Sequence, residues 1–218
     1  MGKYIEIIKD NLPKHPRLLG SEQYLKTAVL VPIFNKNGNC HLLFQERAEH
    51  IRQGGEICFP GGKFDERYDD ANVDTAIRET CEETGIIRED INILGPFNYF
   101  LAPAGVIIHP YVGLLNINSE QELEPNQEVA KLFSVPLKWF INNKPEKYYT
   151  VIEIKPHIIR KDGVKEKLLP VKELGLPDKY SGSWKTRKHR IFVYQIDDYK
   201  IWGMTAELVR ELVRIIKK

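Results

Sequence analysis

Runs of apolar residues separated by turn signals predict a mixture of strands and helices along this chain. Strand-length runs stand at 27–34, 40–47, 91–101, 106–115 and 189–196, and the third is interrupted by Gly95-Pro96. Apolar positions at helical spacing predict helices at 3–11, about 71–84, around 126–133 and 205–218. Because strands and helices mix without strict alternation, we expect an α+β fold, in which helices sandwich a mixed β-sheet.

Two of these predictions are specific enough to check directly. The segment "NKNGN" between the first two strands predicts a hairpin. The closing helix should bury one apolar stripe, which consists of Leu208, Val209, Leu212, Val213 and Ile216.

Residues 141–186 differ in composition from the rest of the chain. They hold nine lysines, four prolines and the hairpin-like "IIRKDGVKEKLL", whose Asp162-Gly163 fits a tight turn. Too little of this stretch is apolar for a core of its own. We therefore expect a single domain over residues 1–218 with an insertion at about 141–186, for which a lid and a dimer arm, and hence a homodimer, remain open. The basic run 185–190 beside Trp184 is either a solvated strand entrance or a surface for the anionic end of a nucleotide.

Composition and charge exclude several classes of protein. A chain of 218 residues can build one full core, and its net charge of +2 gives no reason to expect a nucleic-acid partner. The three cysteines match neither a zinc site nor a disulfide framework. No run approaches the roughly 18 apolar residues of a membrane span, and the first residues do not resemble a secretory signal. We expect a soluble, cytoplasmic protein without a membrane partner.

The predicted helix at 71–84 carries an unusual group of acids. At about 100° per residue, one face of this helix holds the residues expected to pack, which are Ile77, Thr80, Cys81 and Thr84. Glu79, Glu82 and Glu83 point to the opposite side, where like charges repel one another by a few tenths of a kcal/mol per pair. Arg78 can reach Glu82 at i+4 and offset part of this repulsion.

Two interpretations of the acidic face are open. It can be an ordinary solvated surface. Alternatively, it can be a metal site, because "PGG" at 60–62 places side-chain-free backbone just upstream. Carboxylates together with backbone carbonyl oxygen suit the hard cations magnesium and manganese, which bridge phosphate oxygens and activate water.

These residues resemble the Nudix hydrolase family. Its box is Gly, five residues, Glu, seven residues, and then Arg-Glu-apolar-any-Glu-Glu-any-Gly-apolar. "RETCEETGI" at 78–86 matches the second half, with Thr80 at the apolar position. Asp70 stands in place of the first Glu, and seven residues separate it from Gly62 where the family has five. The resemblance implies the Nudix α/β/α sandwich fold.

A second motif is similar to one found in Nudix enzymes that hydrolyse coenzyme A. In "LFQERAEHIRQGGEICFPGG" at 43–62, Arg47, Arg52, Gly55 and the final "FPGG" fit that motif. Gln45 replaces a Thr, and only two residues separate Arg52 from Gly55. The resemblance covers about residues 24–140 and 187–216, leaving the insertion unmatched.

The resemblance implies roles for individual residues. Glu79, Glu82 and Glu83 would bind Mg²⁺ or Mn²⁺, with a carbonyl from Gly61 or Gly62, and Arg78 would orient a carboxylate.

A distant Glu commonly completes such sites. Glu128 is at the matching position, and either it or Glu79 would activate the water. The alternative is that Glu128 is simply a first-turn helix acid, and Glu122 and Glu124 are nearby candidates for the same role.

Arg47 and Arg52 would contact substrate phosphates beside the two glycines, since a guanidinium offers two donors to a phosphate.

The implied activity is metal-dependent hydrolysis of a diphosphate bond in a small nucleotide derivative. The second motif favours coenzyme A or acyl-CoA, cut to phosphopantetheine and adenosine 3′,5′-bisphosphate. Other substrates in the family are ADP-ribose, nucleotide sugars and nucleoside triphosphates. A non-catalytic module that senses a nucleotide is a further alternative, against which the intact acids argue.

Overall fold

The computed structural model describes residues 2–15, 18–103 and 105–218, with the backbone alone at Thr186. The main sheet is mixed. Its central strands follow the order β3-β2-β1-β7-β5, while β4 pairs with β1, β6 with β7, and β8 with β2. These strands are β1 Leu25–Lys36, β2 Asn39–Arg47, β3 Ile57–Cys58, β4 Gly61–Lys63, β5 Ile91–Pro96, β6 Phe100–Ala102, β7 Val106–Leu115 and β8 Val129–Pro136. The predicted hairpin of β1 and β2 is confirmed, and β1 runs parallel to β7.

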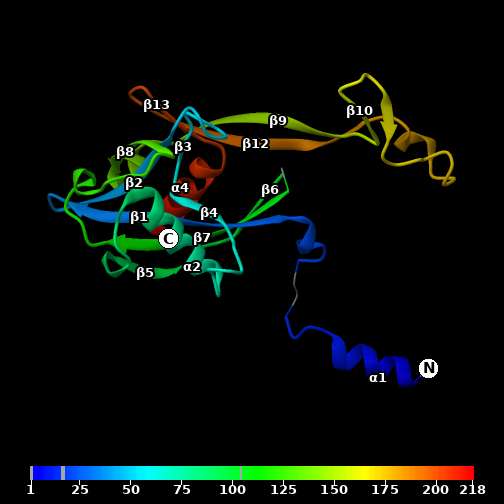
Figure 1. Ribbon diagram of the computed structural model, residues 1–218, viewed down its shortest axis with the longest axis horizontal. Helices are drawn as coiled ribbons and strands as arrows, with labels where there is room; N and C mark the ends of the chain where they lie inside the picture. Colours follow the sequence, from blue (N-terminus) through cyan, green and yellow to red (C-terminus); the bar gives the residue numbers. More distant parts are fainter. Residues whose placement is uncertain (1, 16–17, 104) are drawn as a thin grey trace.

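Two apolar cores lie on opposite faces of this sheet. Helix α2 (Asn72–Thr84) covers one face, where Leu30, Phe34 and Leu43 meet Ile77. The other face, with Val31, Leu42 and Phe44, packs against a second layer. That layer consists of α3 Leu137–Asn142, α4 Gly203–Ile216 and a three-stranded sheet of β9 Glu146–Ile154, β12 Trp184–Ile196 and β13 Tyr199–Trp202. The predicted α+β sandwich with a mixed sheet is therefore confirmed (Figure 1).

Short single turns of 3₁₀ helix connect these elements. They lie at Ser21–Gln23, Arg88–Asp90, Glu120–Glu122 and Asp178–Tyr180.

The predicted helix around 126–133 is wrong, because residues 126–128 are a loop and strand β8 begins at Val129. Val129, Leu132 and Phe133 have helical spacing, but burial follows the two-residue period of a strand, with Phe133 and Val135 buried. Pairing with β2, from His41↔Pro136 to Arg47↔Val129, outweighs the local pattern. The closing helix α4 buries Leu208, Val209 and Leu212 as predicted, whereas Ile216 is 46% exposed.

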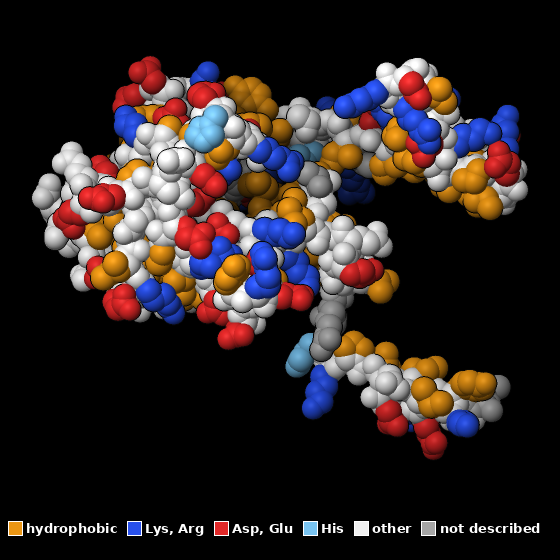
Figure 2. All heavy atoms as spheres, in the orientation of Figure 1, with side chains coloured by type: hydrophobic (Ala, Val, Ile, Leu, Met, Phe, Trp, Pro, Cys, Tyr) orange, Lys and Arg blue, Asp and Glu red, His pale blue; other side chains and the backbone are white. Residues whose placement is uncertain are grey.

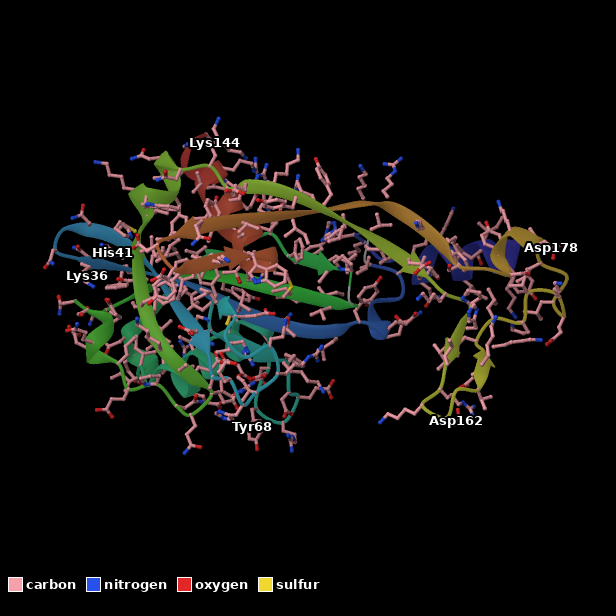
Figure 3. All side chains as sticks on the ribbon, turned by 90° about the horizontal axis from the view of Figure 1, so that it is seen from above. Lys36, His41, Tyr68, Lys144, Asp162 and Asp178 are labelled. Atoms are coloured by element: carbon pink, nitrogen blue, oxygen red, sulfur yellow. The ribbon has the colours of Figure 1, made fainter. Side chains whose placement is uncertain are left out.

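Strands β9 and β12 continue beyond the body as a two-stranded arm. At its far end stands a small hairpin of β10 (His157–Ile159) and β11 (Lys165–Lys167), with the predicted turn at Asp162-Gly163 (Figures 1 and 3). Strand β9 pairs along β12 from Trp184↔Ile154 to Val193↔Glu146. The stretch set apart by its composition thus begins at the end of α3 and contains strand β9 of the second sheet.

Helix α1 (Gly2–Asn11) stands apart from the body and buries none of its residues (Figure 1). Its apolar residues, among them Tyr4 and Ile8, are exposed, and hydrophobic side chains are also visible on the arm (Figure 2). Within the described residues, no helix is long and apolar enough to cross a membrane.

Candidate active site

A tight approach between strand β4 and helix α2 forms the centre of the site. Strand β4 pairs with β1 through Ala28↔Gly62 and Val29↔Gly61. A Cβ atom at Gly61 would lie 2.4 Å from the carbonyl oxygen of Ala28, and one at Gly62 would lie 2.2 Å from the carboxyl carbon of Glu79. Only glycine fits at Gly61, where the clash is with the backbone of β1, whereas a side chain at Gly62 would displace the Glu79 carboxylate. The missing side chain at Gly62 is what lets the Glu79 carboxylate lie against the backbone.

Local interactions fix where α2 begins and ends. The Asp74 carboxylate accepts a hydrogen bond from the Ala71 backbone N–H at 2.9 Å, near the positive end of the helix dipole. Gly85 ends the helix in the left-handed conformation, with φ of 76° and its N–H bonded to the Cys81 carbonyl oxygen. Because the helix begins and ends at these residues, the side that carries Glu79 and Glu83 faces Gly61 and Gly62.

Glu83 is buried, which corrects the expectation that all three acids point away from the packed side. The N–H of Gly61 donates a hydrogen bond to Glu83 Oε2 at 2.9 Å, and Arg47 Nη1 lies 4.0 Å from Glu83 Oε1. The fully buried Gln45 amide is also hydrogen-bonded to this carboxylate. Burial raises the pKa of Glu83 to about 7, although the hydrogen bonds from Gly61 and Gln45 oppose the shift.

The main partner of Arg78 is Asp69, a residue that the sequence did not single out. Arg78 donates from Nε and Nη2 to the two Asp69 carboxylate oxygens, each at 3.0 Å. Asp69 also accepts from the Thr75 hydroxyl at 2.8 Å and from the Asp65 N–H at 3.0 Å. The hydrogen bonds from Arg78 are the main cause that lowers the pKa of Asp69 to about 2, and Asp69 in turn raises the pKa of Arg78.

The placement of Asp70 differs from the motif alignment. Asp70 is exposed, whereas the Asp69 side chain is completely buried against Arg78. The acid that belongs with the box arginine in this chain is therefore Asp69. The sequence held a signal for this residue, because a second acid stands directly beside Asp70, but only packing shows which of the two turns inward.

Arg78 also joins the other two acids of the helix. Its Nη1 donates to Glu79 at 2.7 Å and lies 3.4 Å from Glu82 Oε2, which confirms the predicted i+4 contact. Burial raises the pKa of Glu79, and the hydrogen bond from Arg78 works against that shift. The Glu82 side chain is the most open of the three, at 55% exposure.

Two cavities lie at the junction of β4 and α2. One of about 810 Å³ is lined by Glu79, Glu82, Arg78 and the loop 63–68. Tyr68 marks that loop at the edge of the body in Figure 3. The second, of about 330 Å³, is lined by Gly61 and Gly62 together with Arg47 and Arg52. All four residues for which the sequence suggested substrate contacts thus line one cavity.

The predicted distant acid lies elsewhere. Glu128 is exposed on the loop before β8, so it is not a helix residue, and its carbonyl oxygen accepts from the Ala48 N–H at 2.9 Å. Among the described residues that line either cavity, Glu128, Glu122 and Glu124 do not occur. The role of Glu128 in completing the site stays a prediction.

The donor chemistry of the helix suits a hard divalent cation, and the cradle at Gly62 gives Glu79 direct access to the turn. In the described part of the chain, however, no three His, Cys, Asp or Glu side chains are grouped as a metal cage. Glu79 and Glu82 instead face Arg78, while Glu83 is bonded to Gly61. The metal ligands therefore remain predictions from the sequence.

Replacing Asp69 by Asn should lower the free energy of unfolding by about 2–3 kcal/mol, because Arg78 would lose its buried bidentate partner. Urea unfolding measures this change. The matched control is Asp70→Asn, which alters an exposed neighbour and should stay within about 0.5 kcal/mol of the wild type. Equal effects at the two positions would refute the assignment of Asp69.

Glu83 should make the metal-free protein less stable as pH rises. Its folded pKa of about 7 lies above the ordinary value of 4.5, so the folded state holds this proton more tightly than the unfolded chain. The resulting stabilisation is complete below pH 4.5 and is lost as pH rises through 7. In chelator-treated buffer, the difference in unfolding free energy between wild type and Glu83→Gln should shift by up to about 3 kcal/mol across this window. Parallel pH profiles for the two proteins would contradict it.

Comparisons with known proteins agree with this geometry. The chain matches the NUDIX domain family over residues 24–153. It is 26% identical over 217 residues to an uncharacterized Nudix hydrolase NudL of Photorhabdus laumondii, covering 100% of this chain and 98% of that protein. It is 35% identical over 126 residues to the peroxisomal coenzyme A diphosphatase NUDT7 of Mus musculus, covering 57% of this chain and 51% of the mouse protein.

Among solved structures, the Nudix hydrolase RenU of M. smegmatis aligns at 20% identity with a TM-score of 0.45, over 55% of this chain and 74% of that one. This similarity is too low to carry an argument. The family match, by contrast, spans more than half of the chain and includes the glycine turn and the acidic helix. The protein belongs to the Nudix hydrolase family.

Proposed function

We propose that this Nudix hydrolase cleaves the diphosphate bond of coenzyme A or acyl-CoA, giving phosphopantetheine and adenosine 3′,5′-bisphosphate. The observation that carries the proposal is the junction of β4 and α2. There, Glu79 and Glu83 contact Gly62 and Gly61 between two cavities. A diphosphate laid across the glycines would have one half of the molecule on each side.

Glu79, Glu82 and Glu83 would hold Mg²⁺ or Mn²⁺. Once bound, such an ion neutralises charge on the diphosphate and lowers the pKa of a water molecule. Arg78 positions the carboxylates, because Asp69 fixes its guanidinium from one side while Nη1 reaches Glu79 and Glu82. Glu79 or Glu128 takes the proton of the attacking water.

The arginines of the smaller cavity supply the phosphate contacts. The Nε atom of Arg47 donates to the Arg52 carbonyl oxygen at 3.1 Å, so the two residues are held together at the same wall. Arg47 also lies near the buried Glu83 carboxylate, which links substrate binding to the acidic helix. A guanidinium next to a glycine turn is well suited to phosphate oxygens, since both can donate hydrogen bonds to them.

Support for coenzyme A comes from the motif at 43–62 and from the name of the mouse relative, which denotes a coenzyme A diphosphatase. ADP-ribose, nucleotide sugars and nucleoside triphosphates share the same diphosphate chemistry and are the competing substrates. A nucleotide-sensing module without turnover is disfavoured, because all three acids and Arg78 are present and in contact with one another or with the turn.

Coenzyme A should be hydrolysed only with Mg²⁺ or Mn²⁺ present, and Glu82→Gln should lower kcat at least about 100-fold by removing one charged donor. A panel of coenzyme A, ADP-ribose, a nucleotide sugar and a nucleoside triphosphate, with and without Mn²⁺, measures both effects from the products formed. Because Glu82 is largely exposed, unfolding by urea should show that the variant remains folded.

The control for charge alone is Glu66→Gln, an exposed acid on the rim of the larger cavity, which should retain turnover. Intact coenzyme A beside cleaved ADP-ribose would reject the substrate. Absence of metal-stimulated turnover of every diphosphate would favour the sensing module.

A further inference from the structure

The smaller cavity has a wall that the catalytic motifs do not contain. Besides the arginines and glycines, it is lined by Trp202, Gly203, Met204 and Thr205, from the end of β13 and the start of α4. These residues lie outside the span 24–153 that matches the NUDIX domain family. Their position beside Gly61 and Gly62 therefore calls for an explanation of its own.

The second sheet brings this wall to the site. Strand β13 pairs with β12 through Val193↔Trp202 and contacts β3, the strand that leads into the glycine turn. Ile201 is completely buried in the core, so the alternation of a strand turns Trp202 to the other side, where it is 44% exposed. Gly203, the first residue of α4, adopts a left-handed conformation with φ of 63° and is followed by Met204, which is 40% exposed.

Trp202 and Met204 therefore present apolar surface to a cavity that also holds two arginines. Further apolar residues, including Phe59 and Ile108, line the same cavity. A volume of about 330 Å³ is at the small end for ligand sites, and it suits a flat ring better than a whole dinucleotide-sized substrate. An indole face stacks on a nucleobase, and a thioether also contacts aromatic edges favourably.

We propose that this cavity binds the adenine ring of the nucleotide half of the substrate, stacked on Trp202 and contacted by Met204, with Arg47 and Arg52 meeting the attached phosphates. The inference rests on the proposed function for the identity of the substrate, but it requires only an adenine nucleotide. The pantetheine chain of coenzyme A then extends to the larger, polar cavity on the other side of Glu79.

The arginines support the orientation of the substrate. A base in this cavity places its phosphates between Trp202 and the glycine turn, where Arg47 and Arg52 are held together. The pantetheine chain has no aromatic ring to stack and no phosphate beyond the diphosphate, so it would leave the cavity's arginines without a second anionic partner. Adenosine 3′,5′-bisphosphate matches both the apolar wall and the guanidinium groups.

Calorimetric titration of the wild-type protein with adenosine 3′,5′-bisphosphate, AMP and 4′-phosphopantetheine tests the inference, because none of the three contains the bond that is hydrolysed. Trp202→Ala should weaken the binding of both nucleotides by about tenfold, as expected for one lost stacking contact. Trp202→Phe should restore most of the affinity, and binding of phosphopantetheine should be unchanged in both variants.

The matched control is Trp184→Ala. Trp184 lies on the arm in contact with the Tyr180 ring, 5.3 Å between ring centroids, and its loss should leave all three affinities unchanged. Nucleotide affinity that survives Trp202→Ala, or a loss confined to phosphopantetheine, overturns the inference. The inference is also overturned if neither nucleotide binds the wild-type protein. The same holds if Trp184→Ala loses nucleotide binding while Trp202→Ala retains it.

The two proposals fail in distinguishable ways. If coenzyme A is not hydrolysed but Trp202→Ala weakens AMP, the substrate is wrong and the adenine site stands. If coenzyme A is hydrolysed while Trp202→Ala affects only phosphopantetheine, the function stands and the adenine site is wrong. Thermal unfolding of Trp202→Ala and Trp202→Phe confirms that affinities are compared between folded proteins.

Discussion

The close contact between helix α2 and the glycines of β4 is the constraint on which the site depends. Glu79 occupies the space that a side chain at Gly62 would fill, and Glu83 is bonded to the Gly61 N–H. The Glu79 contact needs a backbone without a Cβ atom at Gly62, and both contacts withdraw a carboxylate largely from water. Burial raises the pKa of each acid, which means that the charged form of both carboxylates is disfavoured at this place. Such perturbed carboxylates in a cleft are typical of functional sites.

The ion pair between Asp69 and Arg78 holds the acidic side chains of the helix in place. A carboxylate that is completely buried and a guanidinium with 22% exposure form two parallel hydrogen bonds, and the remaining guanidinium nitrogen reaches Glu79. The loop 63–70 is thereby fastened to the helix at one end of the larger cavity. On the other side, Arg47 links the buried Glu83 to the smaller cavity. The acidic helix thus connects the two cavities, since Arg78 contacts its acids beside the larger cavity and Arg47 lies near Glu83 beside the smaller one.

The sequence predicted those parts of the fold in which local pattern and packing agree. The β1–β2 hairpin, helix α2 and the arm hairpin all combine a clear period with a turn signal, and all are present. Segment 126–133 shows the limit, because Val129, Leu132 and Phe133 fit a helix until the partner strand β2 is considered. Pairing between segments more than 80 residues apart leaves no signal in a short window.

The candidate site follows the same division. Its acids and glycines could be found from their spacing, whereas the burial of Glu83 and the choice of Asp69 over Asp70 depend on how a helix packs on a sheet. The position of Trp202 beside Gly61 could not be found from the sequence, because it depends on the contact between β13 and β3. Contacts made across layers are decided by tertiary structure, and a single sequence shows only the residues available for them.

Metal-dependent hydrolysis at this site requires that Glu79, Glu82 and Glu83 gather around a divalent ion when one is supplied. Diffraction from crystals soaked in manganese, recorded at a wavelength where manganese scatters anomalously, tests this requirement most directly. We predict an anomalous peak among these three carboxylates, beside the glycine turn. Well-occupied manganese elsewhere on the protein, with no peak beside the acidic helix, would contradict the account.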